Sequence, residues 1–153
     1  MSVFKVFDVV GSGMSAQMLR LNTIASNLAN ADTISTNEND VYQARHPIFE
    51  SVMQDQGSFG QGNLNTGNFN MGSMDDVATV RVREIMQEQT TAIPQYRPNH
   101  PLANDEGFVF SPAIDSVAEM ADMISASRSY QNNIEVLSTV KELTLRTLQM
   151  GQG

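Results

Sequence analysis

Few side chains in this sequence combine the types and the spacing that catalysis or metal binding requires. Two histidines, His46 and His100, have the chemistry of metal ligands, but each stands beside a proline and they are far apart in the chain. The adjacent acids Asp75-Asp76 and Asp105-Glu106 fall in predicted turns, where capping of backbone groups explains them better than acid–base catalysis. No nucleophile stands in a pattern with a base. We therefore predict that the protein is not an enzyme and has no catalytic residue, metal site or cofactor.

The composition excludes several classes of partner. The chain has 153 residues and a formal net charge of −8, and its 9 lysines and arginines form no cluster. Such a surface disfavours nucleic acid and anionic membranes as partners. No apolar stretch approaches the roughly 18 residues of a membrane span, so we predict no lipid insertion. The sequence has no cysteine, which excludes disulfides and thiol catalysis and fits either redox compartment.

The apolar residues are concentrated in a helical stripe at each end of the chain. The first stripe has the alternating steps of three and four residues that are typical of a heptad seam, with Gln17 as its polar member. Its apolar members are Val3, Phe7, Val10, Met14, Leu21, Ile24, Leu28 and Ala31. We predict a helix from about Val3 to about Asn30, because residues 32–37 mostly favour turns.

Two further features mark this first helix. Gly11 and Gly13 lie inside it, either as a tolerated weak turn or where a neighbouring helix approaches closely. Asp8 interrupts the apolar residues near the start, and no small-residue cleavage site follows them. We therefore predict no cleaved signal peptide.

A second, less regular stripe predicts a helix that runs to about Met150, where Gly151 ends it. Ser116 and Glu119 fit a capping box at its start, and Asp115 is the competing N-cap. The members of this stripe are Met120, Ile124, Tyr130, Ile134, Leu137, Val140, Leu143 and Leu148.

Extended segments are predicted in the middle of the chain. Residues 41–53 and 77–85 have the composition and alternation of strands. Residues 104–107 (NDEG) are a strong turn signal and predict a hairpin. The same small sheet is expected to include Ile93, Tyr96 and Val109.

These patterns predict a fold that is mainly α with a small β part. The expected units are residues 1–33, an N-terminal helix; residues 34–114, an extended and β-hairpin segment; and residues 115–153, a C-terminal helix. Within the middle unit, residues 54–74 are too polar and glycine-rich to fold alone and are predicted to be a long flexible loop.

The first apolar stripe is too wide for a single partner helix to cover. Apolar residues also occur beside the seam, namely Phe4, Val6, Val9, Met18, Leu19 and Ala25. We therefore hypothesise that the helices pack against further subunits, and that copies joined head to tail form an open helical filament.

Several blocks of the sequence resemble flagellar rod and hook proteins. Residues 20–33 (RLNTIASNLANADT) and then 42–45 (YQAR) are similar to the N-terminal signature of that family. Residues 126–134 (ASRSYQNNI) resemble the C-terminal block of one short subunit of the proximal rod, and residues 96–103 (YRPNHPLA) the segment before it. The chain departs from the pattern at residues 112–115 (PAID), where the family usually has PNVD.

The resemblance implies a structural subunit of the bacterial flagellar basal-body rod, which transmits torque and encloses the export channel. It further implies an antiparallel coiled-coil pair of terminal helices, a periplasmic location and export through the flagellar type III apparatus without signal cleavage. The implied partners are copies of the chain, other flagellar rod proteins, the basal-body membrane-ring adaptor and the export apparatus. The alternatives are another short rod subunit, and a soluble coiled-coil adaptor or export chaperone that forms a closed oligomer.

We predict an assembly interface on both terminal helices. Asn22, Asn27 and Asn30 are expected to pair with backbone groups where the first helix meets the next segment, or to cap its C-terminus. Arg128 is expected to meet an acidic residue of another subunit, such as Glu119 or Asp122, or to be solvated, and Tyr130 is expected to pack with its hydroxyl bonded. The other predicted interface residues are Phe7, Val10, Met14, Leu21, Ile24, Leu28, Tyr42, Ile134, Leu137, Val140 and Leu148.

Overall fold

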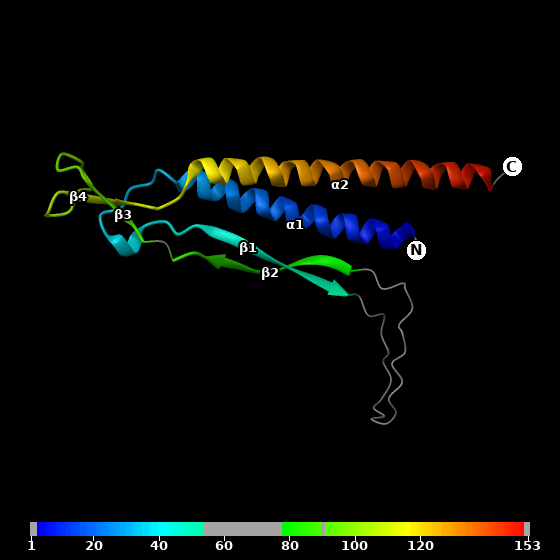
Figure 1. Cartoon of the computed structure of the whole chain (residues 1–153), viewed down its shortest axis with the longest axis horizontal. Helices are drawn as coiled ribbons and strands as arrows, with labels where there is room; N and C mark the ends of the chain where they lie inside the picture. The colour runs from blue at the N-terminus through cyan, green and yellow to red at the C-terminus, as the bar shows by residue number, and fades with distance from the viewer. Residues whose placement is uncertain (1–2, 54–77, 90, 152–153) are drawn as a thin grey trace, which may run out of the picture.

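The computed structural model describes residues 3–53, 78–89 and 91–151. Three layers run along one long axis (Figure 1), namely helix α2 (Ser116–Met150), helix α1 (Val3–Asn30) and a ribbon of strands β1 (Arg45–Met53) and β2 (Ala78–Gln87). Helix α1 is the middle layer, because it contacts α2 on one side and the ribbon on the other. The prediction of a mainly helical fold with a small β part is confirmed.

Helix α1 has the predicted bounds, and turn-forming residues close its C-terminus as predicted. The hydroxyl and the N–H of Thr33 both donate to the Asn30 carbonyl, at 2.7 and 3.2 Å. They satisfy a carbonyl that the end of the helix leaves without a helical donor. Every member of the predicted stripe whose side chain the structure describes is buried or half-buried, so this stripe is the inward face of α1.

Helix α2 starts at the competing N-cap and not with the capping box. Asp115 Oδ1 accepts from the N–H groups of Val117 (2.9 Å) and Ala118 (3.3 Å). The Glu119 side chain, which a capping box would require at this end, is buried against α1 instead, so the capping-box prediction was wrong. The predicted end is confirmed, since α2 finishes at Met150 and the Gly151 N–H donates to the Thr147 carbonyl at 3.1 Å.

The two helices run antiparallel, in a register marked by polar and small residues. Asn27 Nδ2 donates to Glu119 Oε1 at 3.1 Å. A Cβ atom added to Gly13 would lie 3.3 Å from Asn133 Nδ2, whereas one added to Gly11 would meet no atom within 4 Å. Because the residue numbers of each facing pair sum to 146 (27 + 119 and 13 + 133), both contacts belong to one register. Gly13 therefore marks a close approach of α2.

The stripe predicted for α2 is only partly the face that packs on α1. Five of its eight members, Met120, Ile124, Ile134, Leu143 and Leu148, are 43–59% exposed. Among the buried and half-buried residues of α2, one series recurs at steps of four and three, namely Glu119, Met123, Ala126, Tyr130, Asn133, Leu137, Val140 and Thr144. The face of α2 that packs on α1 therefore differs from the apolar stripe at these five positions, because half of the inward positions are polar or small.

Strands β1 and β2 confirm the two predicted strands and form one antiparallel ribbon. Their register shifts between Ile48 and Phe49. The ribbon lies along α1, where the Val80 N–H donates to Ser12 Oγ at 3.2 Å. The predicted loop 54–74 and the acidic pair Asp75-Asp76 lie outside the described residues.

Strands β3 (Ile93–Tyr96) and β4 (Phe108–Ser111) form the predicted hairpin, at the end of the molecule where α1 finishes and α2 begins (Figure 1). Its turn is organised by Asn104, whose Oδ1 accepts from the N–H groups of Glu106 (3.0 Å) and Phe108 (2.8 Å). Gly107 in this turn has a φ of 82°, a conformation that favours glycine.

This hairpin does not extend the β1–β2 ribbon, so the prediction of one sheet containing Ile93, Tyr96 and Val109 was wrong. The outer edge of β4 is occupied by Ser35, whose N–H and carbonyl exchange hydrogen bonds of 2.8 and 2.9 Å with Phe110. The other strand contains Pro94, which has no N–H to donate to a further strand.

Candidate assembly interface

The Asn27 side chain connects three segments that are far apart in the sequence. Its Nδ2 donates to the Arg45 carbonyl (3.0 Å) and to Glu119 Oε1 (3.1 Å). Its Oδ1 accepts from the Arg45 N–H (2.9 Å) and from the Tyr42 hydroxyl (3.0 Å). The residue is fully buried, and both donors and both acceptor positions of the amide are used. The backbone pairing predicted for Asn27 is therefore present, and it joins α1 to β1 and α2.

The surroundings of Asn27 contain further polar groups, which come from α1, from the segment before β1 and from α2. The Tyr42 hydroxyl also lies 3.1 Å from Ser26 Oγ, and the Arg45 guanidinium carbon lies 6.0 Å from the centre of the Tyr42 ring. Glu119 is 7% exposed, and its Oε2 is buried without a hydrogen-bond partner among the described residues. Glu119 stands one heptad interval, seven residues, before Ala126, and this spacing places both on one face of the helix.

The other two asparagines of the N-terminal signature behave differently. Asn30 Nδ2 donates to the Ser26 carbonyl of its own helix at 2.7 Å, which fits the reading of a residue that closes the helix end. Asn22 is exposed on the surface of α1. Only Asn27 among the three therefore bridges α1 to another element.

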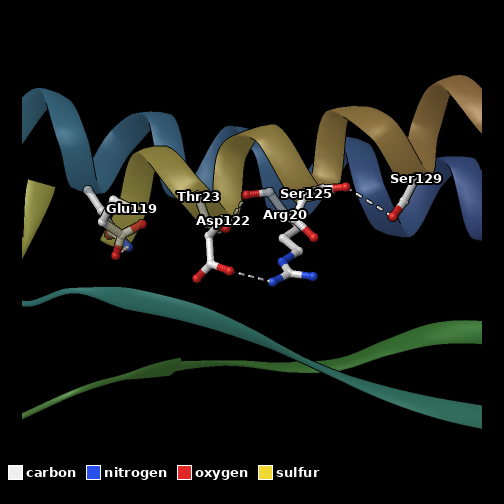
Figure 2. A network of polar contacts seen from close by, with 7 residues as sticks. Arg20, Thr23, Glu119, Asp122, Ser125 and Ser129 are labelled. Atoms are coloured by element: carbon white, nitrogen blue, oxygen red, sulfur yellow. Dashed lines mark hydrogen bonds and ion pairs between the residues drawn. The ribbon is translucent and has the colours of Figure 1, made fainter. Parts of the chain in front are cut away.

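One ion pair crosses between the helices near Asn27. Figure 2 shows the side chains of Arg20 and Asp122 pointing toward each other, and Arg20 donates to Asp122 Oδ1 at 3.0 Å. Both acidic residues expected to meet Arg128 of another subunit are thus engaged within the chain, Asp122 by Arg20 and Glu119 by Asn27. Arg128 itself is exposed.

Most predicted interface residues on α1 face the interior of the subunit. Val10 and Ile24 are buried, and Phe7, Met14, Leu21 and Leu28 are half-buried. On α2, Tyr130, Leu137 and Val140 are half-buried, whereas Ile134 and Leu148 are exposed. The helix side chains that remain free for contact with a neighbour are therefore found chiefly on α2.

Large apolar side chains are exposed along the whole of α2. They range from 43% exposed at Ile134 to 77% at Met150. Toward the C-terminal half, two shallow grooves of about 350 and 270 Å³ adjoin at Val140. The second groove is lined mainly by apolar and threonine side chains, which are Val140, Leu143, Thr144, Thr147 and Leu148. Such a surface is typical of a protein–protein contact. No helix in the described part of the chain is long and apolar enough to cross a membrane.

Comparison with known protein families gives two matches, one at each end of the chain. Residues 7–34 match the family described as flagella basal body rod protein. Residues 105–150 match the family described as flagellar basal body rod FlgEFG protein C-terminal. The two matched regions contain most of α1 and all of α2.

Similar proteins align over the full length of the chain. The flagellar basal-body rod protein FlgC of Yersinia enterocolitica is 40% identical over 152 residues, covering 99% of this chain and 100% of the relative. The FlgC of Salmonella typhimurium is also 40% identical with the same coverage, and that of Aquifex aeolicus is 35% identical over 97% of both chains. With this identity over its whole length, the chain belongs to the FlgC family of flagellar basal-body rod proteins.

Proposed function

We propose that this structural subunit of the flagellar basal-body rod assembles helically with copies of itself and with other rod proteins, through the apolar side chains that α2 exposes. The observation that carries the proposal is the run of exposed leucines, isoleucines, valines and methionines along α2. Among the residues that the structure describes, only one face of α2 is packed, against α1, so the apolar side chains on its other faces need neighbouring subunits to bury them.

The family assignment fixes the class of function. Full-length relatives are rod proteins, so the chain is a structural protein and not an enzyme. In the rod it would transmit torque and enclose the export channel, with α1 and α2 as an antiparallel coiled-coil pair on the channel side. The heptad spacing of the inward residues of both helices supports this coiled-coil geometry.

The three units expected from the sequence give a division of roles. Residues 1–33 and 115–153 would form the helical unit of the tube, and residues 34–114 would face neighbouring rod subunits. By the same proposal the subunit is exported by the flagellar type III apparatus without signal cleavage, resides in the periplasm and meets the membrane-ring adaptor. Arg128 and the exposed residues Ile134 and Leu148 would contribute to contacts with neighbours.

Incorporation into basal bodies tests the proposal. Ile124→Glu and Leu145→Glu place a charge on α2 side chains that are 54% and 51% exposed, so the isolated subunit should keep its stability. We expect both variants to be missing from basal bodies purified from cells that lack the wild-type subunit, and those cells to be non-motile. Ser138→Glu, a change at an exposed polar position of the same helix, is the matched control. Normal incorporation of both glutamate variants would contradict the proposal.

Sedimentation of the purified chain tests the alternative of a coiled-coil adaptor or chaperone. A rod subunit should sediment as a monomer at low concentration and form open polymers or mixed assemblies at high concentration. A discrete dimer or tetramer that does not grow would favour the adaptor.

A further inference from the structure

We propose that Asn27 is the joint that sets the direction of the β1–β2 ribbon relative to the helix pair. In the part of the chain that the structure describes, hydrogen bonds at Asn27 and at Ser12 join the ribbon to α1. At its base, both backbone groups of Arg45 are bonded to the fully buried Asn27 amide. Further along, the Val80 N–H donates to Ser12 Oγ in an exposed bond of 3.2 Å.

Apolar packing alone does not hold the ribbon. No described side chain of the ribbon is buried, and Ile48, Val52 and Val82 are only half-buried. Half-buried side chains stabilise a contact but do not specify a single orientation, because they leave room to slide. Hydrogen bonds at fixed angles do specify one, so the direction of the ribbon depends on the bonds at Asn27 and Ser12.

The Asn27 amide also fixes the position of the ribbon relative to α2. One N–H of Nδ2 is directed at the Arg45 carbonyl and the other at Glu119 Oε1, so the plane of the amide is fixed from both sides. The Tyr42 hydroxyl bonds the amide oxygen from the segment that enters β1. A change of this amide therefore affects the ribbon, while α1 and α2 keep their remaining contacts, including the Arg20–Asp122 pair.

Asn27→Asp is the decisive variant. It keeps the shape and the acceptor for the Arg45 N–H, but replaces the donor with a carboxylate oxygen that faces the Arg45 carbonyl and the Glu119 carboxylate. Repulsion from two acceptors should release the base of the ribbon. Asn22→Asp is the matched control, since it adds the same charge to an exposed position of the same helix.

Paired spin labels on the full-length protein separate movement of the ribbon from loss of the helix pair. The chain has no cysteine, so cysteines introduced at exposed positions label selectively. Ala29 and Ser51 report on the ribbon, and Ala29 and Ser138 report on the helix pair. From the helix rise and the register, the second pair lies roughly 30 Å apart along the axis, within range of dipolar distance measurement.

We expect Asn27→Asp to broaden the Ala29–Ser51 distance distribution and to add a longer component, with the Ala29–Ser138 distribution unchanged. Asn22→Asp should change neither. Unchanged Ala29–Ser51 distances in Asn27→Asp would overturn the proposal, and so would equal broadening of both pairs. If this variant loses its helix content by circular dichroism, the uncharged Asn27→Ala is measured with the same labels and judged by the same outcomes. Because these distances are measured on the dilute subunit, the result does not depend on the proposed mode of assembly.

Discussion

Asn27 donates a hydrogen bond of 3.1 Å to Glu119, which stands 92 residues further along the chain, and both side chains are buried. This bond places the signature near the N-terminus in direct contact with the first turns of α2. The Glu119 carboxyl group receives only this one bond, because its second oxygen has no partner among the described residues. A buried acceptor without a donor lowers the free energy of unfolding. The Asn27–Glu119 pair therefore fixes the register of α1 against α2 but reduces stability.

The first prediction concerns this unpartnered oxygen. Glu119→Gln keeps an oxygen that can accept from Asn27 Nδ2 and replaces the unpartnered carboxylate oxygen with an uncharged NH2 group, which is less unfavourable to bury than a charge. We expect the free energy of unfolding to rise by on the order of 1 kcal/mol in urea titrations at neutral pH. Glu142→Gln, at an exposed position of the same helix, should change it little. A clear loss of stability in Glu119→Gln would contradict this prediction.

The second prediction compares the two glycines of α1. Gly11→Ala should stabilise the protein by about 1 kcal/mol, because alanine is the better helix former and the added Cβ meets open space. Gly13→Ala should gain less or lose stability, because its Cβ would stand 3.3 Å from Asn133 Nδ2. Adding Asn133→Ala should restore the gain at Gly13 and leave the effect at Gly11 unchanged. A thermal or urea denaturation series measures the wild type, the three single variants and the two double variants.

The third prediction concerns the turn of the β3–β4 hairpin. Gly107→Ala should destabilise the hairpin by about 1–2 kcal/mol, because φ is 82° and the new Cβ would stand 3.0 Å from the Tyr96 ring. Faster hydrogen exchange of the Arg97 amide, which donates to the Gly107 carbonyl at 2.9 Å, would report the opening. Gly151→Ala is the control, since its φ is −82° and its nearest contact lies at 3.6 Å. Equal protection of the Arg97 amide in all three proteins would refute this prediction.

The fourth prediction distinguishes the two candidate N-caps of α2. Asp115→Ala removes the acceptor of two N–H groups and should cost about 1 kcal/mol of stability. Ser116→Ala should have little effect, because Ser116 is the first residue of the helix and not its cap. The denaturation midpoints of the two variants are compared with that of the wild type. A larger loss of stability in Ser116→Ala than in Asp115→Ala would contradict the assignment of Asp115 as the N-cap.

The sequence predicted the elements well because they depend on local patterns. The ends of α1 and α2 follow from turn-forming residues after Asn30 and from Gly151, and both are observed near the predicted positions. The Asn104–Gly107 turn signal likewise produces the predicted hairpin. These signals act over a few neighbouring residues, so a single sequence contains them in full.

The packing was harder to predict because it depends on contacts between distant residues. The inward face of α2 includes Glu119, Asn133 and Thr144, which an analysis of apolar residues passes over. Glu119 was assigned to a cap by its local spacing, whereas the buried Asn27 amide determines its actual position. The separation of the two small sheets also depends on a distant residue, since Ser35 closes the edge of β4.

The position of α1 as the middle layer has a consequence for how the two helices tolerate substitution over evolutionary time. A substitution on the side of α1 that packs on α2, or on the side that packs on the β1–β2 ribbon, disturbs folding of its own chain. A substitution on the outer side of α2 affects only the contact with the molecule that binds there. In the proposed assembly, a substitution on the outer side of α2 can therefore be compensated in a neighbouring subunit, either a copy of this chain or another rod protein. A substitution on α1 has to be compensated within the same fold.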